Sequence, residues 1–337
     1  MLLVVNAGSS SVKLAVFDQG LTQVAKAVAE RIGTGGVATH LQALEEGLAT
    51  MGIPLSRLRG AAHRVVHGGA KLTAPTRITA EVAAAIEACV PLAPLHNPAN
   101  LTGIRALSRL SPDLPQYASF DTGFHATNPA VATRYALPAE AEALGLRRYG
   151  FHGISYASLV RKLGEAAPQP LLALHLGNGA SLCAIQNGHS VATTMGYSPL
   201  SGITMGTRSG DIDGNAVLRL AEVHGVEEAG RLLNRASGLH GLGGMSDMRA
   251  LQADGSDAAR FAVDHFVYWA VRHAGSMMAA MGGLDGVAFT GGIGENDAGL
   301  RGRIMDGLAW AGKVPVWVIP AEEERQIAAE AWALMAG

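Results

Sequence analysis

Cysteine is scarce in this chain of 337 residues, which contains only Cys89 and Cys183. Two cysteines cannot form a disulfide framework, and no spacing of Cys and His indicates a zinc site. Both cysteines lie among apolar neighbours, and we interpret them as buried thiols.

Long apolar runs and an excess of one charge are also missing. No apolar segment approaches the ~20 residues of a membrane span, and no basic region followed by a long apolar stretch opens the chain as a signal peptide would. The formal net charge of −2 argues against nucleic acid or an anionic membrane as a partner. We therefore expect a cytoplasmic protein that binds neither.

What is present is typical of a globular protein, with 48% hydrophobic and 16% charged residues. The length exceeds that of a usual single core and predicts two domains. We expect an N-terminal domain at 1–147, a second domain at 148–321, and a C-terminal helix at 322–337 that could pack back on the first domain.

Strand-like segments alternate with helix-like ones, which favours the α/β class. Strands are predicted at Leu2–Val5, Leu14–Phe17, Gly60–Val66, Tyr117–Phe120, Leu171–Leu176, Leu182–Ile185, Gly286–Thr290 and Val314–Ile319. Helices are predicted at Ala80–Cys89, Pro98–Leu110, Ser155–Leu163, Asn215–His224, Val226–Ala236, Ala258–Met281 and Glu322–Met335. Met277, Met278 and Met281 of the longest helix are interpreted as core residues.

Two hairpins with turns of small residues occur in the two halves of the chain. The first reads LLVVNAGSSSVKLAVF from Leu2, and the second reads LLALHLGNGASLCAI from Leu171. Gly8 permits a tight first turn, where serine hydroxyls and N–H groups suit phosphate oxygens and Asn6 offers a carbonyl to a hard cation. A polar turn without a ligand is the alternative for this cluster taken alone. The recurrence suggests a duplicated nucleotide-binding domain.

Arginine recognises carboxylate and phosphate groups because its fork donates two parallel hydrogen bonds and stays charged. Arg208 lies in MGTRSGDID among small residues, which favours a loop that can approach a ligand closely. Arg64, in HRVVHGG, ends a predicted strand. A surface turn before a helix is the alternative for the Arg208 segment, but it explains only the aspartates.

Histidines and one aspartate occupy other loops rich in glycine or proline: His96, Asp121, His125, His152 and His175. A single loop histidine is more often structural than catalytic, and the spacing of these four is unlike that of a metal site. Asp121 follows a strand in FDTGFH, where a turn cap is the alternative. In FTGGIGEN, a strand, a glycine turn and a helix can admit a nucleotide, although no Walker A motif follows.

In chain order the segments are NAGSSSVK, HRVVHGG, APLHNPANL, FDTGFH, YGFHG, HLGNGAS, MGTRSGDID and FTGGIGEN. Together they resemble the acetate kinase family of the actin/hexokinase/acetate kinase superfamily. The resemblance implies two duplicated ribonuclease H-like domains with a nucleotide cleft between them. It implies reversible phosphoryl transfer from ATP to acetate, with Mg²⁺ or Mn²⁺ as cofactor, by a homodimer. The alternatives are a propionate or butyrate kinase, a sugar or polyol kinase of the superfamily, and a non-catalytic nucleotide-binding paralogue.

The same resemblance implies roles for individual residues. The catalytic set is Arg64, His96, Asp121, His152, His175 and Arg208. The carboxylate substrate is expected to contact Arg64, with Val66, Leu95, Phe151 and Pro199 around its acyl chain. The nucleotide is expected at Ser9, Ser11, Lys13, His175, Gly177, Asn178, Gly179, Asp247, Met248, Arg249, Gly291, Gly292, Ile293, Gly294 and Asn296. The metal is expected at Asn6 and Glu323.

The chain is shorter than is usual for this family. Material is missing between Gly20 and His40 and again between Trp310 and Val314. The second gap precedes PAEEERQIA, where the metal-linked glutamate belongs. Glu323 is favoured, but Glu322 and Glu324 leave the register open. Acidic residues that merely stabilise the start of a helix are the alternative.

Overall fold

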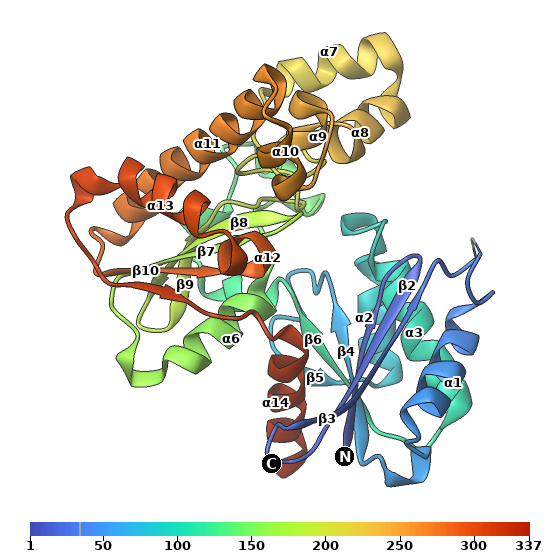
Figure 1. Cartoon of the computed structure of the whole chain (residues 1–337). Coiled ribbons are helices and arrows are strands. Elements are labelled where there is room, and N and C mark those ends of the chain that lie inside the picture. The colour runs from blue at the N-terminus through green and yellow to red at the C-terminus, as the bar shows by residue number, and fades with distance from the viewer. Residues whose placement is uncertain (34) are drawn as a thin grey trace. The chain divides into compact units, whose positions relative to one another are not determined.

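The computed structural model describes residues 1–33 and 35–337 and confirms the α/β class. The chain divides into two units (Figure 1). Unit 1 contains Met1–Ala126, Gly153–Ser158 and Glu322–Gly337, and unit 2 contains Thr127–His152 and Leu159–Ala321. The expected boundary at residue 147 falls within unit 2, whereas the C-terminal residues belong to unit 1.

Unit 1 is built on a six-stranded sheet in the order β3-β2-β1-β4-β6-β5. Its strands are β1 (Leu2–Ala7), β2 (Ser11–Phe17), β3 (Gln23–Glu30), β4 (Gly60–Val65), β5 (Thr76–Arg77) and β6 (Gln116–Phe120). Strands β1, β2 and β3 form an antiparallel meander, and β1, β4 and β6 run parallel to one another. The carboxyl ends of parallel strands lie at one edge of a sheet, where α/β proteins commonly bind ligands.

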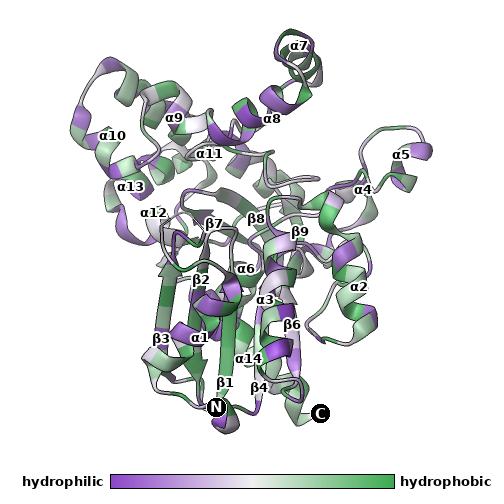
Figure 2. Ribbon diagram, turned by 90° about the vertical axis from the view of Figure 1, so that its right-hand side faces the viewer, coloured by the Kyte–Doolittle hydropathy of each residue, from purple (hydrophilic) through white to green (hydrophobic). Residues whose placement is uncertain are grey.

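Strand β1 is covered on both faces, which explains its continuous apolar run (Figure 2). Because side chains alternate along a strand, Leu3 and Val5 belong to one core cluster and Leu2 and Val4 to another. The first cluster includes residues of α1 (His40–Met51) and α3 (Asn97–Leu110), and the second includes residues of α14 (Glu323–Ala336). Helix α2 (Ala80–Ala88) packs against α3.

Unit 2 contains a five-stranded sheet in the order β11-β10-β7-β8-β9. Its strands are β7 (Leu171–Leu176), β8 (Ala180–Gln186), β9 (His189–Thr193), β10 (Gly286–Thr290) and β11 (Val316–Val318). Strands β7, β8 and β9 are antiparallel neighbours, and β10 and β11 run parallel to β7. The order β9-β8-β7-β10-β11 therefore repeats β3-β2-β1-β4-β6, as the predicted duplication requires.

The longest helix of unit 2, α11 (Asp257–Met281), packs against β8 and β9. Its Met277, Met278 and Met281 are buried, as predicted. The remaining α-helices are α4 (Ala130–Thr133), α5 (Glu140–Ala143), α6 (Gly153–Leu163), α7 (Gly214–His224), α8 (Val226–Arg235), α9 (Gly238–Gly243), α10 (Met248–Asp254), α12 (Gly291–Asn296) and α13 (Ala298–Gly307). Residues Gly153–Ser158 of α6 belong to unit 1.

The sequence predictions miss several elements, chiefly α1, β3 and β9. Strand β3 turns Ala25, Ala27 and Ala29 toward the core and exposes Val24 and Val28. This pattern hides the strand, because its core-facing side chains are less apolar than its exposed ones. Both cysteines are free and buried, as predicted. Within the two described ranges, no helix is long and apolar enough to cross a membrane.

Helix α14 is attached to the unit 1 sheet by a buried apolar face, and this attachment is testable. Ile327 is fully buried in the same cluster as Leu2 and Val4, whereas Leu334 on the same helix is 41% exposed. We expect Ile327→Ala to lower the free energy of unfolding by about 2–5 kcal/mol, because it leaves a cavity. Leu334→Ala should change it by about 0.5 kcal/mol or less. Urea denaturation measures both, and equal losses would contradict this packing.

Candidate functional site

The first group of predicted site residues meets at the carboxyl edge of the unit 1 sheet. Arg64 lies on β4, and Asp121 directly follows β6, its parallel neighbour. The guanidinium Nε donates to Asp121 Oδ1 at 3.2 Å and Nη2 donates to Oδ2 at 2.5 Å. The Asp121 side chain is 3% exposed and that of Arg64 is 24% exposed. Neighbouring strand ends thus form a partly buried, bidentate ion pair.

Asn6 and Glu323 complete this group from β1 and from the first turn of α14. Nη1 of Arg64 donates to Asn6 Oδ1 at 3.4 Å. Burial lowers the pKa of Arg64, but Asp121 and Glu323 outweigh this effect, so the net pKa is raised. Burial raises the pKa of Glu323. The charge of Arg64 opposes this rise, and the charge of Glu324 adds to it. The site therefore concentrates negative charge around one guanidinium.

Asp121 has the same conflict between burial and pairing. Burial raises its pKa, whereas the charge of Arg64 lowers it. The bidentate hydrogen bonds stabilise the charged form. The ion pair with Arg64 therefore opposes the rise in the pKa of Asp121 that burial causes.

Other predicted residues of unit 1 lie around this group. Lys13 is the register partner of Asn6 in the β1–β2 ladder, and its charge lowers the pKa of Glu323. His96 precedes α3, and its charge lowers the pKa of Asp121. Ser9 lies in the hairpin turn and Ser11 begins β2, and Gly8 N–H donates to Ser11 O at 2.7 Å across this turn.

Two buried asparagines of α3 were not singled out from the sequence. Asn100 accepts from Val66 N–H at 3.1 Å and donates to Ala7 O at 2.8 Å, which joins the loop after β4 to the end of β1. Asn97 accepts from His67 N–H and donates to His67 O. The segment APLHNPANL carries a signal for this role, because a buried helix face seldom carries polar residues unless they are hydrogen-bonded.

Two of the residues predicted to surround the acyl chain also belong to unit 1. Val66 is buried and Leu95 is 49% exposed.

In unit 2, His152 and His175 come together beside the HLGNG turn. The two rings stack with centroids 4.0 Å apart, and His152 Nδ1 lies 2.9 Å from Ser181 Oγ. His152 has a φ of +59°, a left-handed conformation that is uncommon for non-glycine residues. A Cβ at Gly179 would lie 3.2 Å from His152 Nε2 and 3.4 Å from Arg208 Nη1. The predicted histidines, Arg208 and this turn therefore form one group.

Arg208 is carried by an irregular loop that lies against the same turn. Its Nη1 donates to Pro199 O at 3.0 Å and to Met205 Sδ at 3.6 Å. Gly206 N–H donates to Asn178 O at 2.9 Å, and a Cβ at Gly206 would lie only 1.9 Å from Asn178 Oδ1. Glycine allows this approach without displacing the Asn178 side chain. Phe151, the remaining predicted residue of the acyl pocket, is buried in unit 2.

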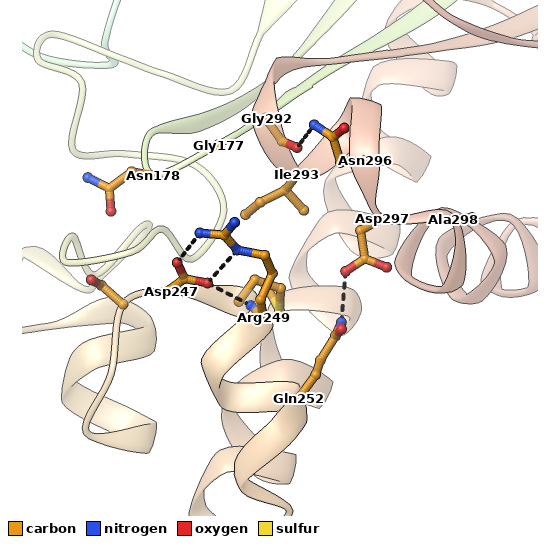
Figure 3. A pocket seen from close by; sticks show the side chains of 12 residues that line it. Gly177, Asn178, Asp247, Arg249, Gln252, Gly292, Ile293, Asn296, Asp297 and Ala298 are labelled. Atoms are coloured by element: carbon orange, nitrogen blue, oxygen red, sulfur yellow. Dashed lines mark hydrogen bonds and ion pairs between the residues drawn. The ribbon is translucent and has the colours of Figure 1, made fainter.

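A cavity of about 580 Å³ lies beside this turn within unit 2 (Figure 3). Its lining includes eight predicted nucleotide residues: Gly177, Asn178, Asp247, Met248, Arg249, Gly292, Ile293 and Asn296. Four further lining residues were not predicted: Ser246, Gln252, Asp297 and Ala298. Ser246, Asp297 and Ala298 lie at helix starts and Gln252 lies within α10, in sequences that carry no distinctive pattern.

Polar contacts shape the cavity wall. Arg249 points toward Asp247 (Figure 3), donating from Nε at 3.1 Å and from Nη2 at 2.6 Å. This hydrogen bonding lowers the pKa of Asp247 to about 2. Gln252 Nε2 donates to Asp297 Oδ2 at 2.8 Å on the opposite side.

The glycines of FTGGIGEN have different positions. Gly292 lines the cavity, and a Cβ there would meet nothing within 4 Å. Gly291 has a φ of +79°, and a Cβ there would lie 2.7 Å from Leu176 O, so this residue is needed for the tight turn from β10 into α12. Gly294 is buried against Leu176 and Phe289.

No cluster of three His, Cys, Asp or Glu that could hold a metal ion occurs among residues 1–33 and 35–337. The predicted metal position offers two oxygen donors, Asn6 and Glu323. Glu322 differs from Glu323, because it pairs with Arg325 at 3.1 Å.

Comparisons with known proteins agree with the resemblance. The acetokinase family model matches residues 34–314. An acetate kinase of Streptomyces griseus is 41% identical, and the match covers 99% of this chain and 96% of that protein. The crystal structure of Porphyromonas gingivalis acetate kinase superposes with a TM-score of 0.92 at 33% identity and 99% coverage of both chains. That of a Francisella tularensis propionate kinase gives 0.92 at 34% identity and 98% coverage of both. The chain belongs to the acetokinase family.

Proposed function

We propose that this enzyme transfers the γ-phosphoryl group of ATP to acetate, giving ADP and acetyl phosphate in a reversible reaction. The observation that carries the proposal is the gathering of Arg208, His152 and His175 around the Gly177–Gly179 turn, next to the cavity of unit 2. A cavity of about 580 Å³ is within the usual range for small-ligand sites.

The chemistry of a carboxylate acceptor suits these residues. A carboxyl group titrates near pH ~4, so acetate is already ionised at neutral pH and needs no general base. Phosphoryl transfer then depends on positioning and on stabilising the charge of the transferring group. We propose that Arg64 binds the carboxylate and that Arg208 and the two histidines, assisted by His96, stabilise the transferring phosphoryl group.

The hydrogen bonding of Asp121 argues against a sugar or polyol kinase. A hydroxyl acceptor requires a general base, and the base must be able to accept the proton of the hydroxyl. Both oxygens of Asp121 accept from Arg64. We therefore propose that Asp121 fixes Arg64 for carboxylate binding.

The nucleotide is proposed to occupy the cavity of unit 2. Its phosphates would lie along Gly177, Asn178 and Gly179, where the backbone is exposed by the absence of side chains. The adenosine would lie among Asp247, Met248, Arg249 and the start of α12. Ser9, Ser11 and Lys13 are proposed to bind phosphate from unit 1. The use of ATP fits a cytoplasmic location.

Asn6 and Glu323 are proposed to hold Mg²⁺, with Mn²⁺ as a substitute. Amide and carboxylate oxygens are the donors that Mg²⁺ prefers, and two protein groups suffice because the ion keeps several waters. The donors fit a cation, because Glu323 lies near both Glu324 and Asp121 and its pKa is raised. When bound, the ion would neutralise phosphate charge. We also propose a homodimer, as the family resemblance implies.

The proposal is tested by incubating the purified protein with acetate, ATP and Mg²⁺ and trapping acyl phosphate with hydroxylamine. We expect hydroxamate to form with acetate and to a smaller extent with propionate. Absence of hydroxamate with every short carboxylate would favour a non-catalytic paralogue. Phosphorylation of a sugar or polyol instead would favour the superfamily alternative.

Arg64→Ala and Arg208→Ala should each reduce kcat by about 10²–10³-fold, because each removes a charged donor placed at developing charge. Lysine at either position should restore only part of the rate, since a point charge cannot replace the bidentate fork. Steady-state kinetics measures the effect. Arg231→Ala serves as the control, because Arg231 lies in an exposed pair with Glu228. Near-normal kcat in both alanine variants would show that the two arginines are structural.

Glu323→Gln should raise the Mg²⁺ concentration required for half-maximal rate and lower kcat. Glu322→Gln is the matched control, because the adjacent Glu322 pairs with Arg325. Magnesium titrations of both variants distinguish the two positions. If they respond alike, the assignment of Glu323 is incorrect.

Acyl-chain selectivity is proposed to depend on Val66, Leu95, Phe151 and Pro199. One methylene group is worth ~1–3 kcal/mol in an apolar pocket, so propionate should be a poorer substrate than acetate. Val66→Ala should raise the kcat/KM of propionate relative to that of acetate, because it enlarges the pocket. Val65→Ala, at a buried core position next to it, should reduce stability without changing this ratio. An unchanged ratio in Val66→Ala would mean that Val66 belongs only to the core.

A further inference from the structure

Helix α11 presents three polar rings toward the loop that carries Arg208. His265, Trp269 and His273 follow one another at intervals of four residues, so they share one face of the helix. His265 Nδ1 lies 2.8 Å from Thr204 Oγ1, near the start of the loop. His273 Nε2 lies 3.4 Å from Asp211 Oδ2, at the end of the loop. The helix therefore meets the loop on both sides of Arg208.

The hydrogen bonds determine where the proton of His265 lies. Trp269 Nε1–H donates to His265 Nε2 at 3.0 Å, and an indole nitrogen can only donate. His265 Nε2 must therefore accept, and in the neutral ring the proton is on Nδ1. That N–H donates to the hydroxyl of Thr204, which is 1% exposed. Burial lowers the pKa of His265, which favours the neutral ring.

Thr204 is one residue from the turn that holds the guanidinium. Met205 N–H donates to Arg208 O at 3.2 Å, and Arg208 Nη1 donates to Met205 Sδ at 3.6 Å. At the far end, Asp211 Oδ1 accepts from Gly202 N–H at 2.7 Å, which closes the loop. A shift of Thr204 would therefore displace groups that position Arg208.

Backbone hydrogen bonds hold the inner side of this loop, where Leu239 N–H donates to Met205 O at 2.8 Å and His240 N–H donates to Gly206 O at 2.9 Å. A cavity of about 390 Å³ is lined by Thr204, Ser209, Asp211, His265 and Trp269, among others. Side chains that border a cavity lack packed neighbours on that side. On the side of the loop that borders this cavity, the contact between His265 and Thr204 is thus a directional side-chain restraint.

We propose that His265, oriented by Trp269, is a positioning residue that holds Arg208 in place through Thr204. The inference rests on the proposed function, because it assumes that Arg208 stabilises the transferring phosphoryl group. It assigns a role in turnover to residues of a scaffold helix, outside the cavity proposed for the nucleotide.

Two substitutions of His265 separate its two hydrogen bonds. The amide nitrogen of asparagine takes about the place of Nδ1, so His265→Asn keeps a donor for Thr204. The amide of glutamine takes about the place of Nε2, so His265→Gln keeps an acceptor for Trp269 but loses the contact with Thr204. We expect His265→Gln and Thr204→Val to lower kcat about tenfold, since small misplacements of a catalytic group are costly, with KM for ATP unchanged. His265→Asn and Thr204→Ser should lose less than threefold.

Asp264→Asn is the control on the same helix, because Asp264 pairs with Arg303 on the exposed side. It should leave kcat unchanged. Melting temperatures of all variants identify any that are merely unstable. Equal losses for His265→Asn and His265→Gln, or wild-type kcat in Thr204→Val, would overturn the inference.

A double-mutant cycle tests whether His265 acts through Arg208. Adding His265→Gln to Arg208→Ala should cause no further fall in kcat, whereas independent roles would give additive losses. ¹⁵N NMR of the histidine rings provides a readout that does not need activity, and it should show His265 as the neutral Nδ1–H tautomer. The other tautomer would overturn the inference, whereas an inactive wild-type enzyme with the expected tautomer would overturn the proposed function.

Discussion

The ion pair between Arg64 and Asp121 is the interaction on which the site in unit 1 depends. Removing one partner of a buried pair leaves an uncompensated charge, at a cost of about 3–5 kcal/mol. The two residues therefore require β4 and β6 to keep their parallel register, since a slip of one residue would turn either side chain to the other face. Asn6 at the end of β1 and Glu323 at the start of α14 are arranged around this pair. The sheet and the C-terminal helix thus each supply charged or polar groups to one site.

In unit 2, a glycine rather than an ion pair allows the functional groups to lie close together. The Arg208 loop can lie against the Gly177–Gly179 turn because Gly206 has no side chain to collide with Asn178. The close approach places a long, charged side chain beside two stacked histidines and next to the cavity. Helix α11 then restrains the loop from behind. The rigidity of that restraint matters because electrostatic stabilisation works best when the donors are already in place.

The two sheets share a topology, but their edges carry different functional groups. In each, an antiparallel hairpin leads into parallel strands, and the turn of the hairpin carries small residues. In unit 1 this edge bears the carboxylates and the guanidinium, whereas in unit 2 it borders the cavity proposed for a nucleotide. The difference lies in the loops and in the residues after the strands, while the shared framework supplies only their starting positions.

The α/β class, most strands and helices, and the short motifs could be predicted from the amino-acid sequence. Runs such as LLVV and LLAL are buried on both sides, so their hydrophobicity alone identifies them. Glycine, arginine and histidine in fixed order identified the family and most of the cavity lining. Strand β3, helix α1 and the role of Asn97 and Asn100 were not apparent. Their sequences carry weak patterns, and their positions depend on neighbours distant in the chain.

Which functional groups meet could not be predicted and depends on the packing of the folded chain. The pairing of Arg64 with Asp121, the contrast between Glu323 and Glu322, and the contact of His265 with Thr204 all join residues from different elements or depend on backbone direction. A side chain's identity states which bonds it can form, but burial and packing decide which partner it finds. That choice involves residues far apart along the chain, and no local pattern encodes it.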